Sequence, residues 1–333
     1  MSTVVLQLSA NAIRQAADAL RAGQLVAFPT ETVYGLGARA DQSGPVRSIF
    51  AAKGRPPGNP LIVHVPDREA ALSLAADWPP MADALARAFW PGPLTLVVTR
   101  APGKVADEAT ASGPTVGVRV PAHPAALDLL REAGVPVAAP SANRSTTISP
   151  TTAAHVMKTL GGIVNVVLDA GPTGFGIEST IIDVTRSPAR LLRHGAIALA
   201  EIARFGEVID ATQVSVDPSA RAEAPGMHEK HYAPRARALL VPAEHLRAKV
   251  NELQAQGEKV GVIDRATERP SSESNGPPSW ITLPADAEGY ASNLYAALHA
   301  LDDSGCDVIV IAEVPSAPAW AAIRDRLRRA TAR

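Results

Sequence analysis

The stretch LVAFPTETVYGLGARADQSGPVRSIFAAKGRPPGNPL, residues 25–61, holds the features that decide the fold of this chain. Its apolar start, Leu25–Phe28, predicts a buried strand; a hydroxyl-rich turn follows at 29–32, and a basic, proline-stiffened loop lies at 53–60. Arginine offers a bidentate fork, lysine a point charge and glycine a close backbone approach, so these residues suit a polyphosphate or a carboxylate. A plain surface turn with a solvated basic loop explains the same residues equally well.

The composition limits the classes of protein to consider. The 333 residues predict roughly two domains, and a hydrophobic content of 46% supplies an ample core. Lys+Arg 32 against Asp+Glu 33 gives a net charge of -1. This balance argues against a nucleic-acid binder that uses its whole surface, but it permits a local basic cleft. The single cysteine, Cys306, excludes an intrachain disulfide and a cysteine-based zinc cluster.

The amino terminus gives no sign of export. It lacks a basic segment followed by an apolar core, so we expect no signal peptide. No apolar run approaches the ~18 residues that a membrane-spanning helix needs. We therefore expect a cytoplasmic protein that makes no contact with a membrane.

The hydrophobic pattern divides the chain into three parts. Residues 1–210 alternate between strand and helix patterns and predict an α/β domain. Residues 211–237 lose this periodicity among proline, glycine and histidine, which predicts a linker. Residues 238–333 again alternate strand and helix and predict a small Rossmann-like α/β domain. No G-x-G-x-x-G follows its first strand, so we do not expect it to bind a dinucleotide.

Three hydroxyl-bearing turns follow or begin apolar runs, and we expect them to converge at one end of a sheet. These pairs are Thr30/Thr32, Ser141/Asn143 and Ser179/Thr180, and the basic residues around them are Lys53, Arg55, His64, Arg119, Arg144 and Arg193. Such donors suit a ligand with phosphates and a carboxylate. We find no obvious pair of carboxylates for acid–base work, no nucleophile elbow and no P-loop.

Each of these residues also has an ordinary structural explanation. A lone histidine such as His64 is more often a core residue than a ligand-binding one, and Arg119 alternates as an outward strand residue would. Thr115 suits a strand by propensity alone. Ser149 is consistent with a plain N-cap of a helix over 150–160, with Pro150 at its first position.

Six motifs in register lead to a family resemblance. They are PTETVYGLG at 29–37, KGRP at 53–56 with NPL at 59–61, PGPLT at 91–95, GVRVP at 117–121, APSAN at 139–143 and ESTIID at 178–183. With PGMHEKHYAP at 225–234 and the C-terminal α/β part, the whole chain resembles the YrdC-like family in its long, two-domain form. The resemblance implies a twisted, open α/β sheet with a concave basic face, and a linker that folds over the active site.

The resemblance also implies an activity, that of a nucleotidyltransferase. ATP, L-threonine and bicarbonate would give threonylcarbamoyl-AMP and pyrophosphate. The product would pass to the tRNA threonylcarbamoyl transferase machinery, which modifies the adenosine next to the anticodon. Mg²⁺ would be carried with ATP rather than bound by protein ligands, and RNA binding by the basic face would be weak.

The resemblance assigns roles to individual positions. The residues implied to hold L-threonine are Thr32, His64, Arg119, Ser141 and Ser179. Those implied to hold ATP are Lys53, Arg55, Asn59, Thr115, Ala139, Ser149, Arg193 and Tyr232, with Ala139 contributing backbone only. Lys53 and Arg55 would be catalytic, because they would offset the charge that develops as pyrophosphate leaves.

Three alternatives stay open. A non-catalytic module that binds double-stranded RNA could use the same basic face, although the near-neutral charge weighs against it. A carbamoyltransferase of hydrogenase maturation shares the core, but its zinc fingers need more than one cysteine. A shorter homologue of unknown activity would lack the linker and the C-terminal part.

Overall fold

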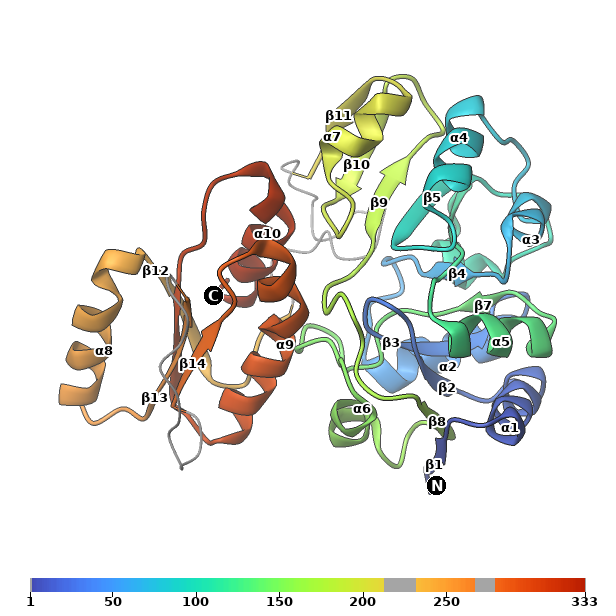
Figure 1. The fold of residues 1–333 in the computed structure, drawn as a ribbon. Helices are drawn as coiled ribbons and strands as arrows, with labels where there is room; N and C mark the ends of the chain where they lie inside the picture. The colour runs from blue at the N-terminus through green and yellow to red at the C-terminus, as the bar shows by residue number, and fades with distance from the viewer. Residues whose placement is uncertain (1, 213–231, 267–278, 333) are drawn as a thin grey trace. The chain divides into compact units, whose positions relative to one another are not determined.

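The computed structural model describes residues 2–212, 232–266 and 279–332 (Figure 1). Within them the chain forms two compact units. The first unit holds residues up to 145 together with 150–174 and 178–212. The second unit holds 146–149, 175–177, and the described residues from 232 onward. Most of the predicted linker, residues 213–231, lies outside the described residues.

The first unit is built on an eleven-stranded mixed sheet with the order β1-β8-β2-β3-β7-β4-β6-β5-β9-β10-β11. The strands are β1 (Val4–Gln7), β2 (Val26–Pro29), β3 (Tyr34–Arg39), β4 (Ile62–His64), β5 (Leu94–Thr99), β6 (Thr115–Arg119), β7 (Val137–Ala138), β8 (Val166–Asp169), β9 (Thr180–Asp183), β10 (Ala189–Arg193) and β11 (Val208–Asp210). The helices are α1 (Ala10–Arg21), α2 (Ser43–Lys53), α3 (Arg68–Ser73), α4 (Pro80–Phe89), α5 (Pro124–Ala133), α6 (Ala153–Leu160) and α7 (Leu199–Ile202), with 3-10 turns η1 (Asp107–Thr110) and η2 (Ala203–Phe205). The predicted large α/β sheet is confirmed.

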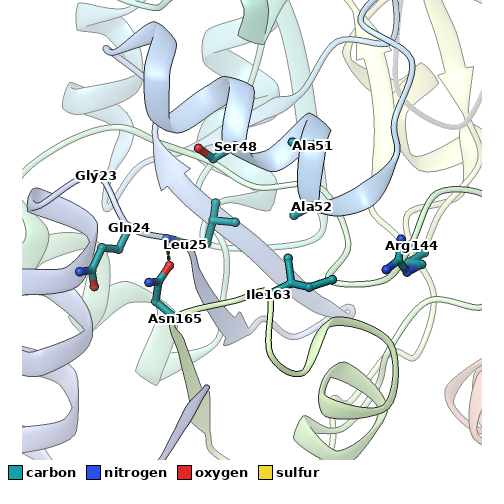
Figure 2. A pocket seen from close by; sticks show the side chains of 9 residues that line it. All are labelled: Gly23, Gln24, Leu25, Ser48, Ala51, Ala52, Arg144, Ile163 and Asn165. Carbon is teal, nitrogen blue, oxygen red and sulfur yellow. Dashed lines mark hydrogen bonds between the residues drawn. The ribbon is translucent and has the colours of Figure 1, made fainter. Parts of the chain in front are cut away.

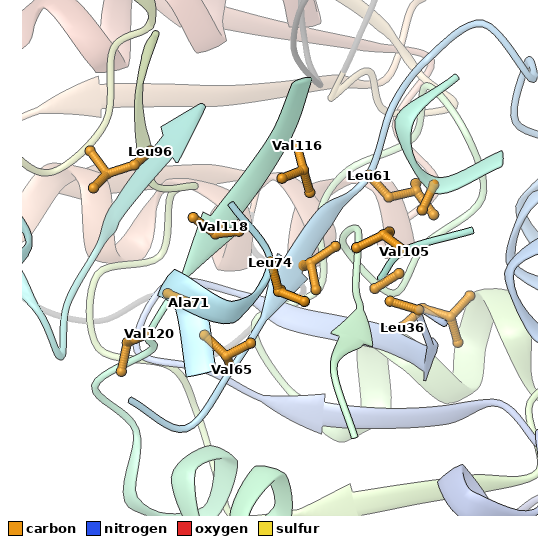
Figure 3. Packing of buried hydrophobic residues seen from close by; sticks show 14 of the residues in the cluster. Leu36, Leu61, Val65, Ala71, Leu74, Leu96, Val105, Val116, Val118 and Val120 are labelled. Carbon is orange, nitrogen blue, oxygen red and sulfur yellow. The ribbon is translucent and has the colours of Figure 1, made fainter. Parts of the chain in front are cut away.

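Two apolar clusters cover opposite faces of this sheet. On β2, Val26 and Phe28 pack with α1 and α5, whereas Ala27 between them joins the larger cluster that includes α2, α4 and α6. Figure 3 shows part of that larger cluster, with Val116, Val118 and neighbouring residues packed together. Alternate strand residues point to opposite faces, so both faces of the strand have to be apolar where helices cover both.

The strand β3 is glycine-rich because its neighbours come close. A Cβ atom at Gly37 would lie 2.8 Å from the ring of Phe28 and 3.0 Å from a methyl group of Val137. The glycines therefore let the Phe28 ring pack across β3. After the predicted turn at 29–32, Tyr34–Arg39 thus forms a strand between β2 and β7.

The helix predicted over 150–160 begins later than expected. It starts at Ala153, and the side chain of Thr152, not Ser149, accepts the capping hydrogen bond from the His155 amide. The reason lies in the preceding segment, where the carbonyl of Pro150 accepts a hydrogen bond from the Tyr34 amide at 2.9 Å. Because that carbonyl accepts a hydrogen bond from β3, it does not accept one of the first hydrogen bonds of the helix.

The second unit is a parallel four-stranded sheet with the order β12-β15-β13-β14. Its strands are β12 (Arg237–Val241), β13 (Val260–Arg265), β14 (Trp280–Leu283) and β15 (Val308–Ala312). Its helices are α8 (Leu246–Ala255), α9 (Ala287–Asp303) and α10 (Ala321–Ala330), with 3-10 turns η3 (Ala243–His245) and η4 (Pro318–Trp320). The predicted α/β character is confirmed. A Rossmann-like order is not, because β15 lies between the first strand, β12, and the second, β13.

No helix among the described residues is both long enough and apolar enough to cross a membrane.

Candidate active site

The sheet register brings four polar side chains into one row. His64 of β4 lies opposite Arg119 of β6. On the other side of β6, the antiparallel register of Leu96 with Val118 places Thr95 of β5 beside Arg119. The Thr95 and Ser179 hydroxyl oxygens are 2.8 Å apart. Residues opposite one another in a sheet share a face, so these side chains line one face while the intervening valines enter the core.

Arg119 is held by the turn that follows β2. Its Nη2 atom donates to the Thr32 hydroxyl at 3.0 Å and lies 2.7 Å from a carboxylate oxygen of Glu31. The Thr30 hydroxyl in turn accepts from the Thr32 and Val33 amides and donates to the Val33 carbonyl. The predicted hydroxyl-rich turn is thus a hydrogen-bonded device that presents Glu31 and Thr32 to a buried arginine.

Glu31 is the site residue that sequence reasoning missed. We expected no carboxylate pair, and a single glutamate between two threonines reads as an ordinary turn residue. The structure buries Glu31 with 8% exposure and Arg119 with 4% exposure. The available signal was a charged side chain inside the PTET turn, directly after a fully apolar strand.

His64 is buried and uncharged at neutral pH. Burial and the nearby Arg119 guanidinium lower its pKa to about 3. The ring packs edge-on to Phe28 at a centroid distance of 6.3 Å. His64 is therefore a core histidine, and it also lies opposite Arg119, whereas its implied role in holding L-threonine stays a prediction.

Ser179 links the row to a second arginine. Arg193 of β10 donates from Nη2 to the Ser179 hydroxyl and from Nε to the Ser179 carbonyl, both at 3.0 Å. Gly195 passes so close to this segment that an added Cβ would lie 2.2 Å from the Thr180 amide nitrogen. The backbone around Ser179 is therefore fixed from two sides.

Lys53 forms a second centre at the end of α2. The helix ends at Gly54, whose φ of 60° is left-handed, a conformation that glycine adopts without strain. The ammonium donates to the carbonyls of Ser141 and Asn143, both at 2.5 Å, and to the Asn143 side chain at 3.4 Å. Burial and the Arg55 charge lower the pKa of Lys53, while the Glu178 carboxylate acts in the opposite direction. Lys53 thus ties two predicted motifs together.

Arg55 organises the basic loop itself. Its Nε donates to the Asn59 carbonyl at 3.1 Å and its Nη2 to the Pro60 carbonyl at 2.9 Å. Asn59 is buried with 2% exposure, and its side-chain oxygen has no hydrogen-bond partner within the described part of the chain. The loop is therefore held in place by Arg55, while Gly54 and residues 56–58 stay exposed to solvent.

Some predicted ATP residues stand apart from these centres. Thr115 begins β6 and Arg119 ends it, so the two lie at opposite ends of the strand. The Ala139 amide donates to the Ile62 carbonyl at 2.9 Å, which leaves its carbonyl as the backbone group to offer.

Ser149 and Tyr232 belong to the second unit. There the Ser149 carbonyl lies 3.2 Å from Nε2 of His299. Tyr232 has a left-handed φ of 62° and stacks on Tyr295 at 5.7 Å, with the Arg326 guanidinium 5.2 Å from its ring centre. The partners named here for Ser149 and Tyr232 all belong to the second unit.

A cavity of about 550 Å³ is lined by Arg144, one of the basic residues singled out in the sequence, but by none of the residues implied to hold L-threonine or ATP. Figure 2 shows Ser48, Ala51 and Ala52 of α2 along one side and Ile163 and Asn165 along the other. The Asn165 side chain accepts a hydrogen bond from the Leu25 amide at 3.0 Å. Part of the polar lining is thus already engaged in holding the start of β2.

Comparison with known proteins extends over the whole chain. Residues 18–195 match the family model Sua5_yciO_yrdC, described as Telomere recombination. Residues 197–332 match Sua5_C, described as Threonylcarbamoyl-AMP synthase, C-terminal domain. These matches confirm the resemblance to the YrdC-like family.

Individual relatives agree with the family models. The threonylcarbamoyl-AMP synthase of Pyrococcus abyssi (strain GE5 / Orsay) is 43% identical over 96% of this chain and 94% of its own length. That of Bacillus subtilis (strain 168) is 39% identical over 96% and 92%. The crystal structure of P. abyssi Sua5 complexed with L-threonine matches with a TM-score of 0.88 and 41% identity, covering 99% of this chain and 98% of that one.

Proposed function

Because this chain belongs to the threonylcarbamoyl-AMP synthase family, we propose that it makes threonylcarbamoyl-AMP and pyrophosphate from L-threonine, bicarbonate and ATP. The observation that carries the proposal is Arg119, a buried guanidinium that donates to the Thr32 hydroxyl and keeps Nε without a hydrogen-bond partner among the described residues, in a chain whose solved relative is complexed with L-threonine. The proposed product serves the threonylcarbamoyl transferase machinery that modifies tRNA beside the anticodon.

The row on the sheet, together with Thr32 and Ser141 from neighbouring turns, forms the proposed threonine site. Arg119 binds the α-carboxylate, since its Nε has no hydrogen-bond partner among the described residues and a guanidinium edge pairs well with a carboxylate. Thr32, Ser141 and Ser179 supply hydroxyl groups for the threonine side chain. Neutral His64 donates or accepts a hydrogen bond without adding a second positive charge beside Arg119.

The Lys53 centre is the proposed phosphate site. Lys53 exchanges a carbonyl partner for a phosphate oxygen when ATP binds, and Arg55 adds a second positive charge. Asn59 lies buried in the same loop. The remaining proposed ATP contacts are Thr115, Ala139, Ser149, Arg193 and Tyr232.

The chemistry we propose consists mainly of positioning. The uncharged threonine amine combines with bicarbonate to give a carbamate and water, and a carbamate oxygen then attacks the α-phosphorus in line with the departing pyrophosphate. Holding three reactants in contact supplies part of the roughly 7–11 kcal/mol found for well-oriented reactions. Lys53 and Arg55 offset the charge on the leaving group.

Mg²⁺ carried with ATP fits these residues. No group of three histidine, cysteine or acidic side chains in the described parts of the chain could hold a metal ion. A magnesium ion coordinated by the triphosphate and water needs no such group. The ion would neutralise phosphate charge that Lys53 and Arg55 do not reach.

The proposal is tested by pyrophosphate release from the purified protein with ATP, with and without L-threonine and bicarbonate. We expect release only when both are present. Release with ATP alone, or none at all, would overturn the proposal and favour the RNA-binding alternative, which a net charge of -1 otherwise disfavours.

A further inference from the structure

We propose that Glu31 binds the ammonium group of the amino-acid substrate, so that Glu31 and Arg119 together recognise a zwitterion. This inference rests on the proposed function, because it names the second charged group of L-threonine. It gives a role to a residue that lies inside the PTETVYGLG motif but received none from the family resemblance.

The first step is the geometry of the pair. A carboxylate oxygen of Glu31 lies 2.7 Å from Nη2 of Arg119. The two whole residues are more than nine-tenths buried, with 8% exposure for Glu31 and 4% for Arg119. Among the described residues, neither Glu31 oxygen makes an aligned hydrogen bond, and neither does the Arg119 Nε. Nη2 of Arg119 is already shared with Thr32. The pair therefore holds unused acceptors and an unused donor side by side.

Burying the Glu31 carboxylate has a free-energy cost. A buried carboxylate that makes one ion contact and no aligned hydrogen bond is costly, since burial is tolerated when the remaining lone pairs are satisfied. A bound ammonium group offers three donors and a positive charge. It would satisfy both the charge and the free lone pairs of Glu31, whereas a threonine hydroxyl offers one donor and no charge.

The third step is complementarity. An α-amino acid carries its ammonium one carbon away from its carboxylate, and Glu31 lies in direct contact with the guanidinium proposed to bind that carboxylate. The Glu31 carboxylate beside the Arg119 guanidinium thus places a negative group next to the substrate ammonium and a positive group next to the substrate carboxylate. The alternative role for Glu31 is only to orient Arg119, and the experiment below separates the two.

The test compares two ligands of the purified full chain by titration in NMR spectroscopy. One is L-threonine and the other is 3-hydroxybutanoate, which lacks the amino group. We expect Glu31→Gln to weaken L-threonine binding at least tenfold and to leave 3-hydroxybutanoate binding unchanged. The control Glu108→Gln, at a glutamate 3.5 Å from Arg47 and outside the site, should change neither.

A second measurement needs no analogue. The Kd of L-threonine for the unmodified protein should rise at pH values above the pKa of the threonine amino group, whereas that of Glu31→Gln should stay flat there. If Glu31→Gln fails to fold, Glu31→Asp keeps the charge on a shorter stem and should show a smaller loss in the same direction.

The outcomes separate the inference from the proposed function. Equal loss of both ligands, or an unchanged L-threonine affinity in Glu31→Gln, would overturn the inference and leave the proposed function standing. Failure of the unmodified protein to bind L-threonine at all would overturn both.

Discussion

Replacing Lys53 by methionine should destabilise the first unit as well as abolish turnover. Methionine keeps most of the apolar stem but removes the ammonium that donates to the Ser141 and Asn143 carbonyls at 2.5 Å. These acceptors belong to a segment far away in the chain, so the lysine acts as a crosslink between α2 and the APSAN motif.

The size of the effect follows from two opposing contributions. A hydrogen bond to a charged group stabilises by about 1.5–3 kcal/mol, and two short ones are lost here. Relief from burying the ammonium offsets part of that loss, in line with the lowered pKa of Lys53. We therefore expect the free energy of unfolding to fall by about 2–4 kcal/mol.

Urea unfolding measures the global change, and hydrogen exchange measured by mass spectrometry locates it. Protection should fall in residues 43–53 and 141–145, because the Ser145 amide donates to the Lys53 carbonyl at 2.8 Å. Lys104→Met, at an exposed lysine of the same unit, is the matched control and should change stability by less than about 0.5 kcal/mol. A Lys53→Met protein as stable as the control would refute the reasoning.

Three further predictions concern the same unit. The pKa of His64 is about 3 in the folded state and about 6.5 when unfolded. Between those pH values only the unfolded chain takes up this proton, so the free energy of unfolding should fall by up to about 1.4 kcal/mol per pH unit below 6.5. In urea titrations at several pH values, His64→Gln should flatten that slope. An unchanged slope would contradict the assignment of the pH dependence to His64. Arg119→Met should lower the free energy of unfolding by about 3–5 kcal/mol, because it leaves the Glu31 carboxylate buried without its charged partner. Adding Glu31→Gln should recover at least about 1 kcal/mol of this loss. Additive losses in a double-mutant cycle would argue against a coupled pair. Gly37→Ala should lower stability by about 1–3 kcal/mol through overlap with the Phe28 ring, while Gly44→Ala, which meets nothing within 4 Å, should not; equal thermal midpoints would count against the packing argument.

Much of the fold was predictable because local pattern and tertiary role coincide. Strand and helix periodicity located the second unit's elements, and the six motifs led to the right family. The hydrophobic pattern could not give the order of the strands in the second unit, because parallel pairing depends on which apolar faces meet. The start of the helix near residue 150 was missed for a similar reason, since a distant strand claims the Pro150 carbonyl.

The sequence singled out most of the polar residues of the candidate site, but it could not show which of them are in contact. Alternation along β6 says that Arg119 faces away from its valine neighbours, but only the register with β4 and β5 says what it meets. The partners of Lys53 lie 88 and 90 residues along the chain, beyond any local signal. Glu31 was missed because its role is defined by an arginine on another strand.

The strand order of the second unit determines when its strands can pair as the chain is synthesised. β15 joins β12 to β13 and β14, yet it is the last strand to leave the ribosome. Until Val308–Ala312 emerges, β12 has no described strand to pair with, and β13 has only β14. Exposed strand edges of this kind invite pairing with other chains. A nascent chain that stalls before Val308 is therefore the form of this protein most exposed to aggregation.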